Sequence, residues 1–585
     1  MKGISIFLIT VALIAGMLGC GEGTPEDWYT LTISSTEGGN VTTPGEGAFT
    51  VPPGAVVIIE AQPEESYIFI NWTGDVASMS DANAATTTIT MNGNYSITAN
   101  FVYVPPGQYA LTISSSPGGS VTSPSEGIST YDEGTVVNLV ATPDIDYYFV
   151  AWTGDVYSIA NINAANTTIT MYANYFITAN FSQGQFIENW YDLDGIRDEL
   201  DGYYILKNDL NCTTPGYAEL ASPTANHGEG WQPIGVVDSF TGTLDGRGRK
   251  ICDLFIYRPA ESMGLFGYVA GEGELKDIGM VNVTVTGYRS VGGLAGANGG
   301  TISDCYATGN VTGDRYVGGL VGSNGGSMTN CYGTANVSGS IAIGCLVGSN
   351  GGTMIDCYAT ASVTGGAAVG GLIGENSGSV TNCYATGSIT SEECVGGLVG
   401  QNGGTLSQCW ATCDVTGDYD AAGGLVGENW GGTVRSCHSG GIVTGGRDVG
   451  GLVGWSLSLA TISNCYATAN VTGDHYVGGL LAWNSWSTVS NCYAVGDVND
   501  PGADGGLVGL NDYGTVSNSF WDIETSGQAA SDGGTGKTTA EMKDTSTFSG
   551  AAWDVVGVAN PTIRNLAYIW NIVDDATYPF LSWEP

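Results

Sequence analysis

The chain has 585 residues, of which 15 are Lys or Arg and 57 are Asp or Glu, so its formal net charge at pH 7 is −42. A surface this acidic repels nucleic acid and anionic lipid, which argues against nucleic-acid-binding proteins and against membrane binding through basic patches. Only 12% of the residues are charged and 42% are hydrophobic, so the chain is expected to fold rather than to form a disordered acidic tail.

The N-terminal segment Met1–Cys20 has one lysine, a short apolar run and small residues before a cysteine, which is the pattern of a secretory signal. Its end, Met17-Leu18-Gly19-Cys20, resembles the lipobox of bacterial lipoproteins. The resemblance implies a lipoprotein signal peptide over 1–19, lipidation of Cys20, and a polar tether over 20–28. An ordinary signal peptide with a chance cysteine is the alternative. No later apolar run reaches the ~18 residues that span a bilayer, so membrane attachment is expected only through the lipid.

Two copies of one module follow, over 29–103 and 109–183, and they align without a gap at an offset of 80 residues. Leu, Ile and Phe alternate with Thr and Ser in both copies, which predicts small all-β domains. The copies resemble divergent internalin-type B repeats, and this resemblance implies β modules strung along surface proteins. Each copy contains Trp-Thr-Gly-Asp, at 72–75 and 152–155. A ligand site is one interpretation, and a core Trp with a Gly-Asp turn is the favoured one.

Residues 184–290 are interpreted as an N-terminal cap and the irregular first coils of a solenoid, because the end of a solenoid needs a cover. The apolar spacing over 193–200 predicts a short amphipathic helix in this cap, with Asp192 or Asp194 as its N-cap. A degenerate copy of the later repeat, Met263-Gly264-Leu265-Phe266-Gly267, marks the approach to the regular coils.

Residues 291–521 are organised by a repeat that starts Val-Gly-Gly-Leu and contains Asn-Cys-Tyr-Ala-Thr. Its leucine returns at steps of 26 to 28 residues, at positions 294, 320, 346, 372, 398, 425, 452, 480 and 507. Val, Ile, Thr and Tyr broken by Asn-Gly and Gly-Gly predict short strands and tight turns. A fixed period of this length is typical of a solenoid, so the fold class is expected to be all-β, a parallel β-helix with coils of about 26 residues.

Stacking would place equivalent residues about 4.8 Å apart and so form ladders along the axis. One ladder is asparagine, at a turn where stacked amides can bond to one another: Asn298, Asn324, Asn350, Asn376, Asn402 and Asn429. Ile302 and Cys305 are three residues apart, so both can point inward only if a bend or bulge separates them.

A cysteine and an aromatic residue stand side by side in each copy. The cysteines are 305, 331, 357, 383, 409, 437, 465 and 492, and the next positions hold Tyr306, Tyr332, Tyr358, Tyr384, Trp410, His438, Tyr466 and Tyr493. Phe520 continues the aromatic series in the last copy. Adjacent strand residues face opposite ways, so we expect the cysteines inside and the rings outside. Parallel Cβ atoms ~4.8 Å apart miss the roughly 3.5–4.5 Å of a disulfide, so the ladder thiols should be free. A Cys212–Cys252 bridge stays open.

The Gly-Gly-Leu-Val-Gly and Asn-Cys-Tyr-Ala-Thr segments resemble the GLUG repeat family. The resemblance covers about half of the chain. It implies a right-handed β-helix on a bacterial surface, as in adhesins and some IgA-specific metallopeptidases, but it implies no reaction. The HExxH motif of a zinc peptidase is absent from the chain, so the protein is not expected to be that enzyme.

After Trp521 the period stops, and 522–585 is interpreted as a C-terminal cap with a closing strand pair within 570–583. Gly533–Thr538 looks like a phosphate-binding loop but has no Gly five residues before Gly536 and no preceding apolar strand. His227, His438 and His475 have no motif partners, and no Cys/His spacing fits zinc. No cofactor and no metal are therefore predicted.

The leading functional hypothesis is a non-catalytic surface lipoprotein, exported and lipid-anchored at the bacterial surface or outer membrane, that acts as an adhesin or binding scaffold. Its expected partners are an extracellular glycan or a surface protein, and the candidate binding residues are Tyr306, Tyr332, Tyr358, Tyr384 and Trp410. One alternative is a β-helical polysaccharide hydrolase or lyase, which two carboxylates with an Arg or Lys in one groove would favour. The other is a structural stalk, in which the rings only stack on one another.

Overall fold

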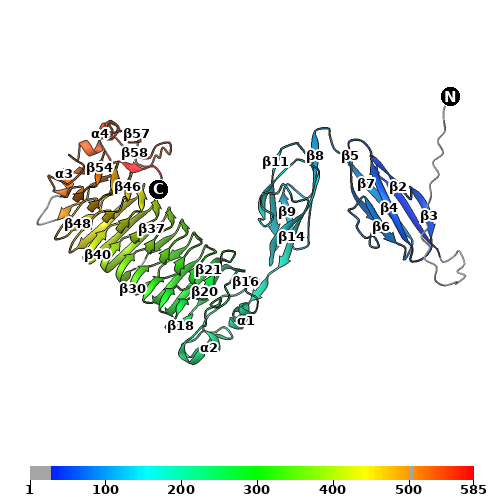
Figure 1. The fold of residues 1–585 in the computed structure, drawn as a ribbon, viewed down its shortest axis with the longest axis horizontal. Coiled ribbons are helices and arrows are strands. Elements are labelled where there is room, and N and C mark those ends of the chain that lie inside the picture. Colours follow the sequence, from blue (N-terminus) through cyan, green and yellow to red (C-terminus); the bar gives the residue numbers. More distant parts are fainter. Residues whose placement is uncertain (1–27, 361, 500–504, 585) are drawn as a thin grey trace. The chain divides into compact units, whose positions relative to one another are not determined.

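The computed structural model describes residues 28–360, 362–499 and 505–584. It is all-β with 5% helix, which confirms the predicted fold class, and it divides into two compact units after Gln183 (Figure 1). The signal peptide and Cys20 lie outside the described residues.

Each N-terminal module consists of a four-stranded and a three-stranded sheet, in the orders β3-β1-β7-β5 with β2-β4-β6, and β10-β8-β14-β12 with β13-β11-β9. The first module comprises β1 (Tyr29–Ser35), β2 (Gly39–Thr43), β3 (Gly47–Val51), β4 (Val56–Pro63), β5 (Tyr67–Gly74), β6 (Thr86–Thr90) and β7 (Tyr95–Tyr103). The second comprises β8 (Gln108–Ser115), β9 (Gly119–Ser123), β10 (Gly127–Asp132), β11 (Val136–Pro143), β12 (Tyr147–Gly154), β13 (Asn166–Thr170) and β14 (Tyr175–Gln183).

The Trp-Thr-Gly-Asp motif is structural in both modules. In the first, Trp72 is buried in the core and its Nε1 donates to the carbonyl of Ala84 at 3.1 Å. Gly74 has a φ of +97°, a left-handed conformation that favours glycine. The Asp75 carboxylate then accepts a hydrogen bond from the Ser96 N–H at 2.8 Å. The favoured interpretation, a core Trp and a Gly-Asp turn, is confirmed.

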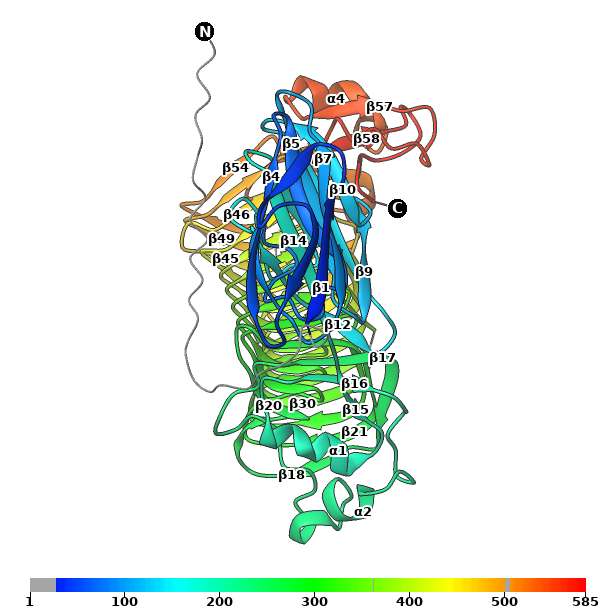
Figure 2. The same cartoon turned by 90° about the vertical axis from the view of Figure 1, so that its right-hand side faces the viewer.

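The N-terminal cap of the solenoid comprises β15 (Gln185–Ile187), α1 (Trp190–Asp194), the 3₁₀ turn η2 (Gly195–Asp198), β16 (Tyr203–Leu206), α2 (Tyr217–Leu220) and η3 (Ala225–Gly228). The predicted N-cap was wrong, because the side chain of Asn189 accepts from the N–H groups of Tyr191 and Asp192. Asp192 instead lies in the first turn, and its carboxylate accepts from the N–H of Glu188. The helix therefore starts at Trp190, before the predicted start, and the Trp190 side chain is buried. The cap helices lie at one end of the stacked coils (Figures 1 and 2).

The solenoid has about 10 turns of ~27 residues. One face is a ten-stranded parallel sheet of β20 (Phe266–Val269), β23 (Ala295–Asn298), β27 (Val321–Asn324), β31 (Val347–Asn350), β35 (Ile373–Asn376), β38 (Val399–Asn402), β41 (Val426–Trp430), β45 (Val453–Leu457), β49 (Leu481–Ser485) and β53 (Val508–Asp512). All other solenoid strands join one continuous sheet. It starts with β15 and β16 of the cap and continues with β17 (Thr243–Cys252), β18 (Phe255–Tyr257), β19 (Glu261–Met263), β21 (Glu274–Thr286) and β22 (Arg289–Val291).

Within each regular coil this continuous sheet contributes a short strand and then the strand that starts with the aromatic ladder residue. The short strands are β24 (Thr301–Ser303), β28 (Ser327–Thr329), β32 (Thr353–Ile355), β36 (Ser379–Thr381), β39 (Thr405–Ser407), β42 (Thr433–Arg435), β46 (Thr461–Ser463), β50 (Thr488–Ser490) and β54 (Thr515–Ser517). The aromatic strands are β25 (Tyr306–Thr312), β29 (Tyr332–Gly333), β33 (Tyr358–Thr360), β37 (Tyr384–Gly396), β40 (Trp410–Gly423), β43 (His438–Gly445), β47 (Tyr466–Ala467), β51 (Tyr493–Ala494) and β55 (Phe520–Asp522). Connecting strands are β26 (Arg315–Gly318), β30 (Asn336–Gly344), β34 (Val363–Gly370), β44 (Val449–Gly450), β48 (Asn470–Thr472) and β52 (Val498–Asn499).

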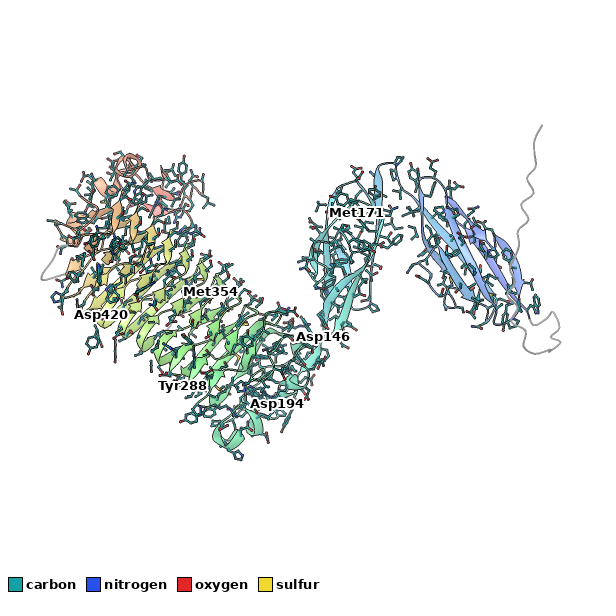
Figure 3. All side chains as sticks on the ribbon, in the orientation of Figure 1. Asp146, Met171, Asp194, Tyr288, Met354 and Asp420 are labelled. Atoms are coloured by element: carbon teal, nitrogen blue, oxygen red, sulfur yellow. The ribbon has the colours of Figure 1, made fainter. Side chains whose placement is uncertain are left out.

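A bend separates each short strand from the aromatic strand after it. Ile302 and Cys305 are both fully buried, and Asp304 between them has a φ of +53°, a left-handed conformation that Asp and Asn tolerate. The expected bend is thus a single left-handed residue per coil. Ile302 and Cys305 belong to the buried core of the coils, in which Met354 occupies the position of Ile302 two coils later. Figure 3 labels Met354 on the stacked coils.

The asparagine ladder is a buried chain of amide hydrogen bonds. Each Nδ2 donates to the Oδ1 of the next coil's asparagine at 2.7–2.8 Å, from Asn298 through to Asn429. Ser456 breaks the chain, because its buried Oγ has no hydrogen-bond partner. The next ladder residue, Asn484, resumes the pattern by donating to Asn511, but its own Oδ1 is unpartnered.

The ladder cysteines are fully buried, and all described cysteines, including Cys212 and Cys252, are free thiols. Each ladder thiol donates back to a backbone carbonyl two residues earlier, as Cys383 does to Thr381 at 3.2 Å. Burial raises the pKa of the Cys305 thiol to about 12, so this thiol is protonated at neutral pH. In the last coil Ser519 takes the cysteine position, and its Oγ bonds to the equivalent carbonyl, that of Ser517.

The C-terminal segment comprises α3 (Ile523–Ser526), β56 (Thr535–Lys537), η4 (Glu541–Lys543), α4 (Thr545–Gly550), β57 (Val555–Gly557), β58 (Trp570–Ile572) and β59 (Phe580–Leu581). β56 adds one parallel rung to β55, so the Gly-rich stretch that looked like a phosphate loop includes a strand. β58 and β59 form the predicted closing pair, and they run antiparallel. This segment lies at the end of the coils opposite α1 (Figures 1 and 2).

Candidate functional site: an aromatic stripe and a pocket

The aromatic ladder forms a column of parallel rings outside the coils, here called the aromatic stripe: Tyr306, Tyr332, Tyr358, Tyr384, Trp410, His438, Tyr466 and Tyr493. Successive ring centroids are 4.4–6.0 Å apart and the planes differ by 3–7°. The rings point away from the buried cysteines beside them, because adjacent strand positions face opposite sides. The strands thus place one ring per coil in register.

The faces of these rings are covered by their neighbours. Parallel rings at this spacing pack face to face, so what remains for solvent is ring edges and hydroxyl groups. The column starts at Tyr306, whose ring lies over Gly279, where a Cβ would fall 2.5 Å from the ring. Burial raises the pKa of the Tyr332 and Tyr384 hydroxyls, so at neutral pH they are protonated and can donate hydrogen bonds.

The C-terminal segment covers the far end of the stripe. Tyr466 and Tyr493 are buried in one cluster with Trp570. The Tyr466 hydroxyl donates to Glu584 Oε1 at 3.0 Å, and the Tyr493 hydroxyl donates to the carbonyl of Pro579. These two rungs lie outside the coils, as expected, but they are not exposed to solvent, because the cap folds back over them instead of only closing the last coil.

The five predicted binding residues remain uncovered. Tyr306, Tyr332, Tyr358, Tyr384 and Trp410 are each half-buried, and we call this set the open stripe. Its boundary is His438, whose ring stacks on Trp410 on one side and on Tyr466 on the other. The structure thus brings all five residues together on one flat face, and their role in binding stays a prediction.

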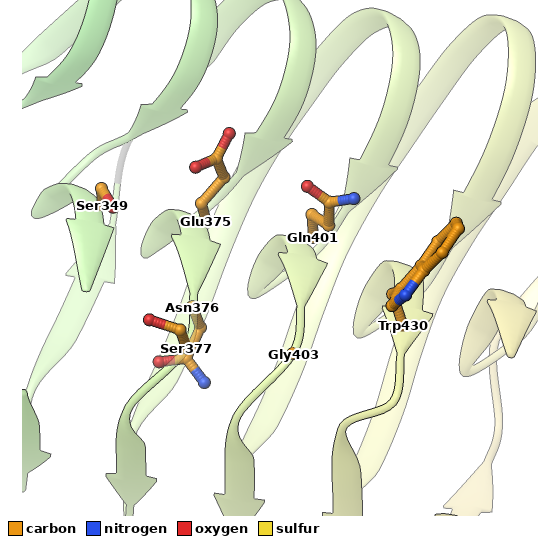
Figure 4. A pocket seen from close by; sticks show the side chains of 7 residues that line it. All are labelled: Ser349, Glu375, Asn376, Ser377, Gln401, Gly403 and Trp430. Atoms are coloured by element: carbon orange, nitrogen blue, oxygen red, sulfur yellow. The ribbon is translucent and has the colours of Figure 1, made fainter. Parts of the chain in front are cut away.

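A pocket of about 230 Å³ lies at the edge of the ten-stranded sheet, away from the stripe strands. It is lined by Ser349, Glu375, Asn376, Ser377, Gln401, Gly403 and Trp430 (Figure 4). Glu375 and Gln401 occupy the same position on consecutive strands, β35 and β38. Trp430 ends the next strand, β41. Three successive coils therefore supply the carboxylate, the amide and the indole of one hollow.

One carboxylate faces this pocket, and a second is buried behind it. Burial raises the pKa of the Glu375 carboxyl, while Arg315 and Arg289 lower it. Glu428 is 6% exposed and accepts a hydrogen bond from Gln401 Nε2 at 2.8 Å. A glycosidase needs two carboxylates that both reach the substrate. The pocket lining offers only Glu375. The pocket therefore lacks the pair of carboxylates in one groove that would favour a hydrolase.

The pocket was not anticipated from the sequence. The residue directly after each ladder asparagine is usually Gly, as at Gly351 and Gly403. Trp430, which follows Asn429, departs from this pattern. A large aromatic ring at an exposed position that holds glycine or serine in the preceding coils was the available signal. The aromatic residues that recur once per coil follow the cysteines, and Trp430, which does not recur, lies outside that pattern.

The described residues contain no group of three or more His, Cys, Asp or Glu side chains that could hold a metal ion. Within the same part of the chain, no helix is long and apolar enough to cross a membrane.

His438 is a rung of the stripe, and burial lowers its pKa to about 4.

Comparison with protein families identifies the repeats. Residues 29–105 and 109–185 match the divergent InlB B-repeat domain. Residues 287–312, 365–390, 445–472 and 473–499 match the GLUG motif. The chain therefore carries two divergent InlB B-repeat modules followed by GLUG motifs, as predicted. These are repeat families of surface proteins, which supports an extracellular β-helical protein.

Two curated relatives match short segments. Halomucin of Haloquadratum walsbyi is 38% identical over 112 residues, which are 19% of this chain and 1% of halomucin. A protein of Evansella cellulosilytica named "Putative Gly-rich membrane protein" is 34% identical over 125 residues, 20% of this chain and 14% of that protein. The chain thus spans only a small part of either relative.

Two solved structures show a distant likeness. A "putative immunoglobulin A1 protease" from Bacteroides ovatus is 19% identical, with 69% of this chain and 93% of that chain covered and a TM-score of 0.24. A second structure, titled "IgA1 Protease", is 13% identical, with 67% and 26% covered and a TM-score of 0.23. Likenesses this weak carry no argument about function.

Proposed function

We propose that this protein is a non-catalytic, lipid-anchored binding protein of the bacterial surface, whose open stripe binds a polypeptide partner. The observation that supports it most directly is the C-terminal segment, which packs on the neighbouring rungs of the same stripe. Tyr466 and Tyr493 make hydrogen bonds to that segment through their hydroxyls. The open stripe continues the same column, with the same edges and hydroxyls unoccupied by that segment.

The chemistry of the open stripe suits an extended peptide better than a sugar. Sugars stack on ring faces, and these faces are covered by neighbouring rings. The edges and hydroxyls combine apolar contact with hydrogen-bond donors, and tyrosine rings held rigid lose little entropy on binding. Four steps of about 4.8 Å from Tyr306 to Trp410 give a surface roughly 19 Å long, enough for five or six extended residues.

The alternatives have less support. A featureless stalk would offer neither an aromatic surface nor a hollow, and the described residues include both. A polysaccharide hydrolase or lyase needs converging catalytic groups, and the pocket lining holds one carboxylate.

The test is adhesion of the full chain to host-type cells and to immobilised surface proteins. A Tyr332→Ser, Tyr358→Ser, Tyr384→Ser variant should bind at least tenfold more weakly, with an unchanged circular dichroism spectrum. A matched Tyr→Phe triple keeps the stack and removes the hydroxyls, so it separates edge contact from hydrogen bonding.

Treatment of the target cells distinguishes the kind of partner. Protease treatment should abolish stripe-dependent adhesion, and glycosidase treatment should leave it intact. Adhesion that the serine triple does not weaken, or that survives protease treatment, would overturn the proposal.

A further inference from the structure

Trp430 has what the stripe rings lack, a free aromatic face. Its side chain is 56% exposed, although an indole is among the largest apolar groups a surface can present. The preceding coil has Gly403 in the equivalent stretch, so no side chain from that position covers the ring. Figure 4 shows the indole standing beside Gln401, with Gly403 contributing no side chain. The protein therefore keeps one large ring uncovered at the edge of a hollow.

The polar groups around the hollow are held in fixed orientations. Buried Glu428 can only accept hydrogen bonds when ionised, so the amide nitrogen of Gln401 must face it. This leaves the carbonyl oxygen and one N–H of Gln401 for a ligand. Glu375 adds a half-buried carboxylate acceptor one coil earlier, and Ser377 adds an exposed hydroxyl. Donors and acceptors beside an aromatic face are the groups that recognise a sugar ring.

The volume of the pocket and the charge of the protein limit which class of ligand can bind there. A volume of about 230 Å³ is below the ~300–1,000 Å³ typical of pockets for drug-sized ligands, so it accommodates one ring rather than an oligosaccharide. A carboxylate in the lining and a net charge of −42 disfavour uronic and sialic acids. We propose that this pocket binds one uncharged sugar residue of a glycan, with the ring stacked on Trp430 and its hydroxyls bonded to Glu375 and Gln401.

The glycine at the floor provides a clean way to block the pocket. A Cβ at Gly403 would meet the carbonyl oxygens of Trp430 and Asn376 at 3.5 and 3.8 Å, which is ordinary contact. Gly325 has the same place three coils earlier, outside the pocket lining, and a Cβ there would meet only Asn298 O at 3.7 Å. Gly403→Leu should therefore fill the pocket without disturbing the coil, and Gly325→Leu is its matched control.

The experiment is saturation-transfer NMR on the full chain, with a panel of neutral methyl hexosides and N-acetylhexosamines and with glucuronate as the charged probe. The wild type should bind at least one neutral sugar, and Gly403→Leu and Trp430→Ala should weaken that binding about tenfold or more. Gly325→Leu should leave it within about twofold. The inference is overturned if the wild type binds none of the neutral sugars, if glucuronate binds more tightly than they do, or if Gly403→Leu has no effect.

This site is independent of the proposed polypeptide partner. The serine triple of the open stripe should keep sugar binding, and Gly403→Leu should keep protease-sensitive adhesion. Loss of both activities in either variant would contradict two separate sites.

Discussion

Trp583 lies against His438, with their ring centroids 5.8 Å apart, and the next residue, Glu584, brings its Oε1 to 3.5 Å from His438 Nδ1. These contacts join residues almost 150 positions apart in the chain. They mark where the C-terminal segment begins to cover the stripe, one rung beyond Trp410. The extent of the open stripe is therefore set by how far this segment reaches.

Acidification should destabilise the protein through His438. Burial lowers its pKa to about 4, below the ~6.5 of an unfolded imidazole, so the unfolded chain takes up the proton first. Stability is then complete above about pH 6.5 and is lost as the pH falls towards 4. At pH 5 the expected cost is about 2 kcal/mol. Chemical unfolding of the wild type at pH 7 and 5 measures it.

The matched variant for this prediction is His438→Phe, because the ladder already accepts a phenyl ring at Phe520. Burial raises the pKa of the Glu584 carboxyl. The folded state therefore takes up this proton before the unfolded state does, so Glu584 contributes stability to the protein as the pH falls, opposite in sign to His438. Both proteins share that contribution, and their difference isolates the imidazole. Equal losses of stability in the two proteins between pH 7 and 5 would refute the prediction.

Ser456→Asn should stabilise the solenoid by reconnecting the asparagine ladder. The new Nδ2 would donate to the unpartnered Oδ1 of Asn484, and the new Oδ1 would accept from Asn429. Satisfying buried polar atoms that lack partners is worth about 1–2 kcal/mol. An increase in melting temperature is the expected result, and Asn350→Ser should lower it by breaking an intact stretch. A variant no more stable than wild type would show that the break at Ser456 costs nothing.

Cys383→Ser should cost little, at the lower end of the 1–3 kcal/mol for placing a hydroxyl in an apolar column. The reason is Ser519, which occupies the cysteine position in the last coil and whose Oγ bonds to a backbone carbonyl. Cys383→Leu, which overfills the column, should cost more. Urea unfolding compares the variants, and thiol titration of the denatured wild type should find the ladder cysteines free. Disulfide-linked peptides joining Cys357 and Cys383 would contradict the packing.

Cys20→Ser should release the protein from the membrane fraction, because the predicted lipid on this residue supplies the attachment. The measurement is fractionation of cells that express either form, with a carbonate wash to remove adsorbed protein. Retention of the serine variant in the washed membranes would rule out Cys20 as the anchor.

The repeat period was enough to predict the coils, the ladders and the side that each ladder faces. Cys305 and Tyr306 could be assigned to opposite sides because strand geometry alternates, and a bend or bulge between Ile302 and Cys305 could be predicted because both must point inward. These relations are between residues close in the chain or exactly one period apart, so a single sequence carries them. The same pattern predicted the five residues of the open stripe.

The covering of Tyr466 and Tyr493 and the pocket at Trp430 were decided by the tertiary structure. The C-terminal segment has no period, so nothing in its spacing indicates which rungs Trp570 and Trp583 contact. The pocket arises because Glu375, Gln401 and Trp430 come from three coils whose side chains differ, while the repeat specifies only what the coils share. Sequence periodicity determined the scaffold, and contacts between non-equivalent residues, which depend on packing in three dimensions, decided which parts of its surface are open.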